Sequence, residues 1–309
     1  MDKQCVRNYF NKNAEEWIKS GYDEDKYSYP VAFHRARIVS SVLAEKGPNL
    51  NILDLGCGGG NLSILLAKNG HNVVGVDQSS KMIDIANESR GNLPKEEQYR
   101  VRFVLSDLEK IDLQENHFDA VTAMGLIGYL PNDDILFRLA DDLLRPEGTF
   151  LVSCRNRLFN MVSLSYRTVK EIEQGEAVPL LYEIDELYQG IPKQEIEDFL
   201  DCLKESVQGI EVEALSDSFG EESASIRLGK DDNALEARQH TPKRLTEKAA
   251  EFGFKNTHCF GVHPHLMDPR VNRLLPPDVY NRISCSLEPL EQLPVSLVWS
   301  SVFLSVFEK

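Results

Sequence analysis

The sequence predicts an α/β fold: a doubly wound sheet of seven mostly parallel strands, with a mainly helical cap inserted into it. Short apolar runs alternate with amphipathic helical patterns from about residue 51 to residue 155, which is typical of a parallel sheet covered by helices. A cluster of glycines directly follows the first apolar run, as expected where a strand turns tightly into a helix. The alternation stops near residue 156 and resumes near residue 241, so an insertion is expected between them.

Each predicted strand is a short apolar run bounded by Gly, Pro, Asp or Asn. The predicted strands cover 51–56, 72–77, 101–107, 118–125, 149–155, 255–265 and 294–309, the last as one long strand. Between and before them, apolar residues recur at helical spacing, and several of these segments end at Gly or Pro, which stop helices. The predicted helices cover 6–17, 32–47, 61–70, 79–89, 133–148 and 241–254.

The same pattern divides the chain into a core and its additions. We assign 1–47 to an N-terminal helical segment, 48–155 and 241–309 to the core, and 156–240 to the cap, with 264–296 as a second cap loop. Both insertions follow strands of the sheet, and parallel strands end at the edge where ligands bind in such folds. The insertions are therefore expected to meet over an active site. The alternative is that one of them forms a dimer contact, so we expect a monomer or a homodimer.

Composition and charge narrow the class of substrate. Of the 309 residues, 42% are hydrophobic and 27% are charged, and the formal net charge is −15. Phosphate backbones repel so acidic a protein, so we expect a small-molecule substrate and no nucleic acid. The first residues lack the apolar core of a signal peptide, no run is long enough to span a membrane, and the six cysteines are scattered. We therefore expect a cytoplasmic protein with reduced thiols and no membrane contact.

The glycine-rich turn has the pattern D-x-G-x-G-x-G, formed by Asp54, Gly56, Gly58 and Gly60. Glycines allow backbone N–H groups to approach a ligand, and the N-terminus of the following helix adds a partial positive charge. The dinucleotide fingerprint G-x-G-x-x-G is not met, because residue 61 is asparagine. An acid just before the glycines suits a ligand with a positively charged group.

Three further motifs follow the turn in order. The second strand ends in Asp77, about twenty residues further on, where an acid commonly binds a ribose diol. "LSDL" follows the third strand, and "FDAVTAMGLIGYL" contains the fourth. Together with "LDLGCGGG" and "VVGVDQS", these motifs make residues 35 to 155 resemble the class I S-adenosylmethionine-dependent methyltransferases, which have a Rossmann-like sheet.

This resemblance implies S-adenosylmethionine as the cofactor and gives roles to residues of the motifs. Asp54, Gly56, Gly58 and Gly60 would face its methionine part, and Asp77 would bind the ribose. The residues implied around the adenine or beneath the transferred methyl group are Gln78, Met82, Ser106, Asp107, Leu108, Met124 and Gly125. The alternative is a purely structural glycine turn in a fold that has lost its ligand.

A second resemblance is carried by "YFNKNAEEW" and "HTPKRLTEKAAEFGF". These segments look like the small-molecule branch typified by quinone-biosynthesis and sugar methyltransferases. The resemblance implies that the N-terminal helix closes over the cofactor as a lid, lined by candidates Tyr9, Tyr27, Tyr29 and Arg35. Arg35 would meet the cofactor carboxylate; the alternative is an ordinary surface arginine.

The acceptor side is predicted from chemistry. A hydroxyl acceptor needs a general base, and His263 and His265 lie at a strand end next to the predicted cap. Tyr129, after the fourth strand, is a further candidate for catalysis or acceptor binding. Arg155 and Arg157 are candidates to hold an anionic group. For each of these residues the alternative is a structural role.

We therefore expect an enzyme that methylates a hydroxyl of a small polar metabolite, such as a sugar or a natural-product intermediate, with histidine as base. The alternatives are N-methylation of a small amine, methylation of RNA or protein, and cofactor binding without catalysis. His263, His265 and Asp268 have the spacing H-x-H-x-x-D, which alone is too unspecific to predict a metal, and we predict none.

Overall fold

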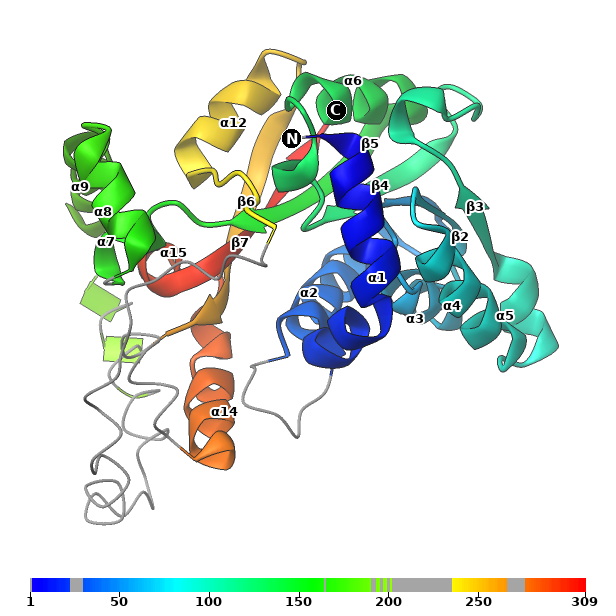
Figure 1. Ribbon diagram of the computed structural model, residues 1–309, viewed down its shortest axis with the longest axis horizontal. Helices are drawn as coiled ribbons and strands as arrows, with labels where there is room; N and C mark the ends of the chain where they lie inside the picture. Colours follow the sequence, from blue (N-terminus) through cyan, green and yellow to red (C-terminus); the bar gives the residue numbers. More distant parts are fainter. Residues whose placement is uncertain are drawn as a thin grey trace.

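One sheet runs through the core of the computed structural model (Figure 1), which describes residues 2–22, 30–163, 165–189, 193–194, 197–198, 201, 235–265 and 276–309. The strands are β1 Asn51–Leu55, β2 Asn72–Asp77, β3 Val101–Leu105, β4 Phe118–Met124, β5 Leu144–Arg155, β6 Lys255–Pro264 and β7 Ser300–Glu308. Their order across the sheet is β3-β2-β1-β4-β5-β7-β6.

All strands except β7 run in one direction. β1 pairs in parallel with β2 and β4, β2 with β3, and β4 with β5. β7 is antiparallel to both of its neighbours, β5 and β6, so β6 points the same way as the first five strands. The prediction of a seven-stranded, mostly parallel sheet is confirmed. The carboxyl ends of all the parallel strands lie at one edge.

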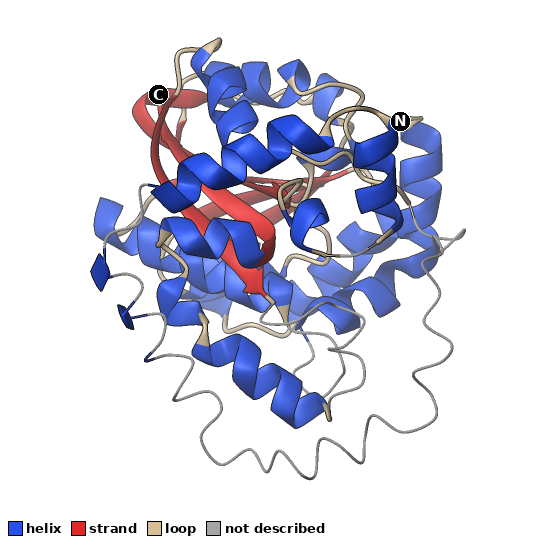
Figure 2. Cartoon of the chain, turned by 90° about the vertical axis from the view of Figure 1, so that its left-hand side faces the viewer, coloured by secondary structure: helices blue, strands red, loops and turns tan. Residues whose placement is uncertain are grey.

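Helices pack on both faces of the sheet (Figures 1 and 2). Leu53 and Leu55 of β1 belong to an apolar cluster with α6 and α12, whereas Ile52 of β1 belongs to a second cluster with α2 and α3, as expected for a strand buried on both faces. The core helices are α1 Lys3–Tyr22, α2 Val31–Lys46, α3 Asn61–Lys68, α4 Ser80–Gly91, α5 Lys95–Arg100, η1 Leu108–Lys110, η2 Ile127–Tyr129, α6 Asp134–Leu143 and α12 Pro242–Ala250.

The prediction of one strand over 294–309 is wrong for its first part. Residues Pro294–Trp299 form the helix α15, and only β7 is extended. Pro294 occupies the first turn of α15, where the missing N–H costs nothing. The Asn156 side chain donates to the carbonyl oxygens of Leu297 and Ser300, which satisfies acceptors at the end of the helix. A buried apolar run does not by itself distinguish a helix from a strand.

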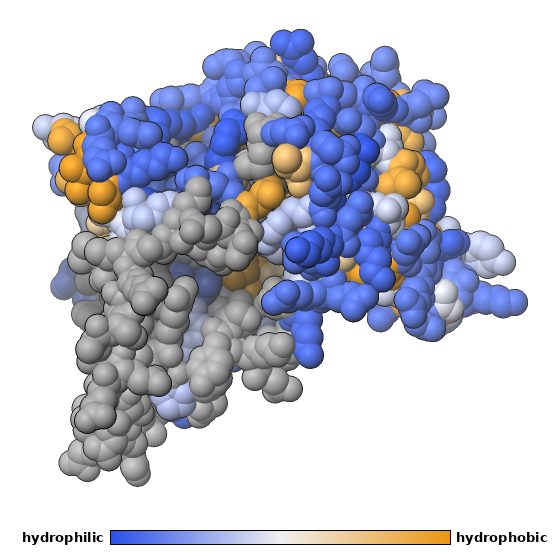
Figure 3. All heavy atoms as spheres, viewed as in Figure 1, coloured by the Kyte–Doolittle hydropathy of each residue, from blue (hydrophilic) through white to orange (hydrophobic). Residues whose placement is uncertain are grey.

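The insertion after β5 is mainly helical in its described residues, as predicted. It contains α7 Phe159–Val162, α8 Tyr166–Glu173 and α9 Ala177–Gln189, and residues 202–234 lie outside the described part. Exposed apolar side chains on α9 form a patch at the left of Figure 3. An isolated bridge between Asn156 and His240 joins the two ends of this insertion. The second insertion contains α14 Pro277–Ser286, η4 Glu288–Leu290 and α15.

Phe137 on α6 lies at the centre of an aromatic cluster, and its side chain is fully buried. We expect Phe137→Ala to lower the free energy of unfolding by about 3–5 kcal/mol in urea denaturation, because the ring leaves a cavity. Tyr99→Ala is the control, since that ring is 84% exposed. A loss below about 1 kcal/mol for Phe137→Ala would contradict this packing. The ring contacts are with Phe150, Phe252, Phe254 and Phe307.

Candidate active site

The glycine-rich turn joins β1 to α3 at the carboxyl edge of the sheet. Gly56 and Gly58 have φ angles of 67° and 53°, in the left-handed region that residues with a Cβ rarely adopt. The carbonyl of Val76 accepts the N–H groups of Gly56 and Cys57 at 2.8 and 3.0 Å. The turn is thereby fixed against the end of β2 with its backbone open to a ligand.

Two cavities meet at this turn. Among the predicted residues, the first cavity is lined by Gly56, Gly58, Asp77, Gln78, Met82, Asp107, Leu108, Met124, Gly125 and Tyr129. The second cavity has a volume of about 600 Å³ and is lined by Arg35, Asp54, Gly56, Gly58, Met124, Gly125, Tyr129, Arg155, His263 and His265, among others. Residues of the turn and of the end of β4 line both cavities, so the two share a wall.

Asp77 lies at the end of β2, in the first cavity. Its two carboxylate oxygens accept the N–H groups of Gly58 and Ser79 at 3.0 and 2.8 Å. Burial raises the pKa of Asp77, and these backbone hydrogen bonds oppose the rise. Each oxygen has a further lone pair, so the carboxylate can also accept the hydroxyls of a diol.

Asp54, the last residue but one of β1, is buried and lines the second cavity. It accepts hydrogen bonds from Ser63 Oγ at 2.6 Å and from Thr122 Oγ1 at 2.8 Å. Burial raises the pKa of Asp54 to about 6, although these hydrogen bonds lower it. A positively charged ligand group in the cavity would favour the ionised form.

Helix α1 covers the first cavity with residues that the sequence analysis did not select. Lys3, Val6, Phe10 and Trp17 line the cavity, and their spacing of three, four and seven places them on one face of a helix. That spacing is the signal that could have identified them. Of the predicted lid residues, Tyr9 lines neither cavity, and residues 27 and 29 lie outside the described part.

Polar contacts fix α1 to the carboxyl edge of the sheet. Lys3 Nζ lies 3.2 Å from Asp107 Oδ1 and 2.6 Å from Glu109 Oε2. Burial by itself would raise the pKa of Asp107. The N–H of Glu109 and the ammonium of Lys3 lower it by more, so the pKa of Asp107 lies below its usual value. Ser79 Oγ also donates to Asn11 Oδ1 at 2.7 Å. The described helix therefore already lies over the loops that follow β2 and β3.

Arg35 of α2 reaches the shared wall of the cavities. Its Nη1 donates to Ser153 Oγ at 3.2 Å, and the N–H of Gly125 donates to the same oxygen at 3.0 Å. A Cβ on residue 125 would lie 2.7 Å from Arg35 Nη1, so the glycine gives the guanidinium room. Arg35 is thus placed next to the predicted methyl-facing motif, where it can meet a carboxylate.

The two predicted catalytic histidines lie together at the end of β6. The ring centroids of His263 and His265 are 4.1 Å apart, and both residues line the second cavity. His263 Nε2 lies 2.7 Å from the hydroxyl of Tyr280, and its Nδ1 lies 3.0 Å from Ser301 Oγ. Burial lowers the pKa of His263 well below its usual value, so the ring is neutral at pH 7.

Tyr129 and Arg155 also line the second cavity. The ring of Tyr129 packs edge-on against Phe10 at 5.3 Å, and burial raises the pKa of its hydroxyl, which therefore stays protonated. Arg155 ends β5 and lines the cavity. Within the described part of the chain, its guanidinium makes no hydrogen bond or ion pair.

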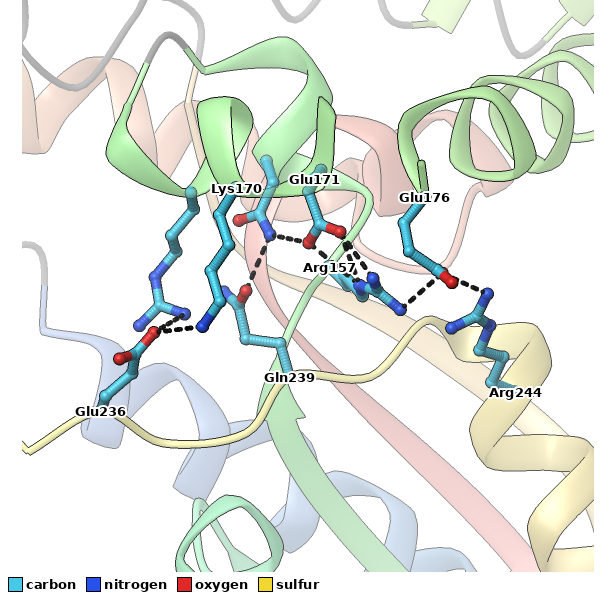
Figure 4. Close-up of polar contacts among 9 residues, drawn as sticks. Arg157, Lys170, Glu171, Glu176, Glu236, Gln239 and Arg244 are labelled. Atoms are coloured by element: carbon cyan, nitrogen blue, oxygen red, sulfur yellow. Dashed lines mark hydrogen bonds and ion pairs between the residues drawn. The ribbon is translucent and has the colours of Figure 1, made fainter. Parts of the chain in front are cut away.

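Arg157 is placed differently (Figure 4). Its guanidinium pairs with Glu171 Oε2 at 2.5 Å and with Glu176 Oε2 at 3.1 Å. Asn160 also donates to Glu171, at 2.8 Å. Arg157 lines neither cavity, and these contacts favour a structural role in joining β5 to the cap.

Two predicted cofactor residues also lie outside the cavities. A Cβ on Gly60 would lie 2.5 Å from Phe103 Cζ, so the small size of this residue serves packing. Ser106 donates through its N–H to the carbonyl of Asp77 at 3.0 Å and through its hydroxyl to the carbonyl of Asp107 at 3.0 Å. Ser106 therefore shapes the loop that carries Asp107.

Within the described residues, no group of three His, Cys, Asp or Glu side chains is arranged to hold a metal ion. Residue 268 of the H-x-H-x-x-D spacing lies outside the described part. Among the helices that the structure describes, none is both long and apolar enough to cross a bilayer.

A family model described as a methyltransferase domain matches residues 46–206, more than half of the chain. The chain belongs to this family. Its fold and motifs are those of a class I S-adenosylmethionine-dependent methyltransferase, and S-adenosylmethionine is its cofactor.

Curated relatives include ubiquinone biosynthesis O-methyltransferases. That of Coxiella burnetii (strain Dugway 5J108-111) is 33% identical over 159 residues, which cover 52% of this chain and 64% of the relative. That of Xanthomonas campestris pv. campestris (strain B100) is 34% identical over 110 residues, which cover 36% and 45%. The chain thus spans less than two thirds of the length of these relatives.

Solved structures share the fold at low identity. The magnesium protoporphyrin IX methyltransferase from Synechocystis PCC 6803 with bound SAH gives a TM-score of 0.53 at 16% identity, with 100% of both chains covered. The cyclase SpnF gives 0.54 at 15% identity, with 98% of this chain and 94% of that chain covered. Because a cyclase shares the fold, the fold alone does not decide the reaction.

The residues at the turn fit S-adenosylmethionine. Gly56 and Gly58 line both cavities in a left-handed conformation that favours glycine, and the buried acid Asp54 suits the positive charge of the methionine part. Asp77 retains acceptor sites for the ribose hydroxyls. Arg35 supplies a cation for the carboxylate.

The raised pKa of Asp54 predicts how stability depends on pH. Since the folded-state pKa of about 6 exceeds the usual aspartate value of 3.8, the stabilisation is complete only below pH 3.8 and is lost as pH rises through 6. We expect the free energy of unfolding without cofactor to fall between pH 4 and pH 7 by about 2 kcal/mol relative to Asp54→Asn. Urea unfolding of both proteins at pH 4 to 7 measures this difference, and a constant difference would contradict the raised pKa.

Asp77→Ala should weaken binding of S-adenosylmethionine by about 10- to 100-fold, because hydrogen bonds to a charged acceptor are lost. Isothermal titration calorimetry measures the change. Asp84→Ala is the matched control, since Asp84 lies on the exposed face of α4. Equal affinities of the wild type and Asp77→Ala would exclude Asp77 from the cofactor site.

Proposed function

We propose that the protein transfers the methyl group of S-adenosylmethionine to a hydroxyl of a small polar metabolite in the cytoplasm. The observation that carries this proposal is the second cavity, which starts at the wall shared with the cofactor side and reaches His263 and His265. The bound cofactor supplies an electrophilic methyl group on a sulfonium. The similarity to ubiquinone biosynthesis O-methyltransferases supports a hydroxyl acceptor.

A hydroxyl must lose its proton as it is methylated, and the histidine pair can accept it. The neutral state of His263 at pH 7 suits a base, but both of its ring nitrogens already lie within hydrogen-bond distance of hydroxyls. We therefore assign contact with the acceptor to His265 and the positioning of that ring to His263. Ser301 and Tyr280 hold His263 in place.

The walls of the second cavity orient the acceptor. Tyr129 and Met124 belong to both cavities, so an acceptor packed against them lies next to the methyl group. Phe159 and Tyr166 of the cap also line this cavity. Packing of the acceptor among these side chains would hold the attacking oxygen in line with the methyl group, which favours displacement.

An amine acceptor has less support. The described lining of the second cavity contains one carboxylate, Asp54, and four arginines. Glu171 and Glu176 of the cap are already paired with Arg157, so they do not attract a cation. The net charge of −15 likewise gives no support to an RNA acceptor.

The test uses methyl-labelled S-adenosylmethionine, the purified protein and a metabolite extract, with Asp77→Ala as the control. Label that appears in a small molecule, and not with the variant, supports the proposal and gives the acceptor by mass. Label in added protein or RNA would overturn the small-molecule acceptor. Cofactor binding without methyl transfer to small molecules, protein or RNA would indicate a binding protein instead of an enzyme.

His265→Ala should lower the rate of transfer by about 10²- to 10⁴-fold, the usual contribution of a general base. His263→Ala should lower it less, and rates of both variants should be compared at pH 7 and pH 9. At pH 9 hydroxide partly replaces a missing base. The rate of His265→Ala should therefore rise by a larger factor between pH 7 and pH 9 than the rate of the wild type. Unchanged rates in both variants would exclude histidine as the base.

A further inference from the structure

We propose that the acceptor carries an oxyanion, such as a carboxylate or a phosphate, that binds between Arg155 and Arg167 on the cap side of the second cavity. This inference rests on the proposed function and gives its acceptor a chemical class. It gives the role of anion binding, predicted from the sequence for Arg155 and Arg157, to Arg155 and Arg167.

The two guanidiniums come from different parts of the fold but face one cavity. Arg155 ends β5, and Arg167 lies in the first turn of α8. Both line the second cavity, together with the hydroxyl-bearing Ser163, Ser165 and Tyr166. Burial and the like charge of Arg155 lower the pKa of the Arg167 guanidinium. Two cations that repel each other in one cavity would be stabilised by a shared anion.

Nearby carboxylates are committed elsewhere, as Figure 4 shows. Glu171 pairs with Arg157, whose guanidinium also contacts Glu176. Glu176 in turn pairs with Arg244 of α12 at 2.8 Å. These two carboxylates therefore do not neutralise the cavity.

Glu236, the third carboxylate labelled in Figure 4, also has partners. Glu236 lies 3.1 Å from Lys170 Nζ and 3.9 Å from Arg167 Nη1. Its closer contact is with Lys170, so Arg167 is only partly neutralised. Arg155 has no carboxylate partner among the described residues. The cap side of the cavity therefore keeps an excess of positive charge in a protein whose net charge is −15.

The other arginines of the cavity have their own contacts. Arg238 Nη2 lies 2.7 Å from Asp133 Oδ1, and Arg35 donates to Ser153 at the cofactor wall. Arg155 and Arg167 remain to bind an acceptor. Arginine binds carboxylate and phosphate oxygens through two parallel hydrogen bonds, so this pair suits an oxyanion better than a neutral sugar.

The position of Arg155 allows one acceptor to meet both sites. Arg155 lines the same cavity as Tyr129, at the wall shared with the cofactor side, and as His263, next to the assigned base. One molecule in this cavity can therefore carry both the reacting hydroxyl and the oxyanion.

The first test divides a metabolite extract on an anion-exchange resin at pH 7 and supplies each pool with methyl-labelled S-adenosylmethionine. The wild type should label the retained pool. Arg155→Gln and Arg167→Gln should each lower kcat/KM about 10- to 100-fold, mainly through KM, because a charged hydrogen bond is lost. Arg155→Lys should restore part of the loss. Arg244→Gln, outside the cavity, is the matched control.

Transfer confined to the unretained pool would overturn the anion site while leaving the methyltransferase function intact. Transfer to neither pool would instead contradict the proposed function. Treating the retained pool with phosphatase separates the two oxyanions, since transfer to a phosphate ester would stop and transfer to a carboxylate would persist.

A second test does not depend on turnover. Phenylglyoxal modifies arginine side chains, and mass spectrometry follows each site in the full-length protein with and without inorganic phosphate or acetate. At least one of these anions should slow modification of Arg155 and Arg167 about fivefold or more and leave Arg244 unchanged. Equal rates at Arg155 and Arg167 with and without both anions would overturn the anion site.

Discussion

The active site depends on a buried carboxylate at the end of β1. Asp54 accepts one hydrogen bond from α3 and one from β4, so the strand, the following helix and the neighbouring strand meet at one side chain. Burying an acid is costly unless it is well paired, and the raised pKa of Asp54 reflects that cost. A neutral amide could make similar hydrogen bonds without it. The acid is therefore better explained by a cationic ligand than by the fold.

The cavity at the glycine turn could be predicted because its signals are local. The glycines at positions 56 and 58 themselves indicate a left-handed backbone, and the end of an apolar run indicates that Asp77 lies at the end of a strand. The alternation of strands and helices also predicted the sheet and its parallel direction. Each of these features depends on residues within one turn or one strand.

The acceptor side could be predicted only in part, because it depends on contacts between distant residues. Arg155 and Arg157 look equivalent in the sequence, yet only the packing of α8 brings Glu171 to Arg157 and leaves Arg155 facing the cavity. Arg167 was missed because its cavity exists only once the cap folds back on β5. In the same way, the apolar run of α15 does not indicate a helix, because the hydrogen bonds that Asn156 donates to its end come from a distant part of the chain.

The reversed direction of β7 has a consequence for how such a protein can diverge. Because β7 is antiparallel, its first residues return to the edge where the other strands end, and Ser301 there contacts His263. The stretch that defines the family, 46–206, includes the glycine turn and Asp77 but neither histidine of the pair. Under the proposed function, mutations after residue 235 can alter the histidine pair without touching the glycine turn, whereas Arg155 and Arg167 lie inside the matched stretch. The proposed base and the proposed anion site are therefore encoded in separate parts of the chain.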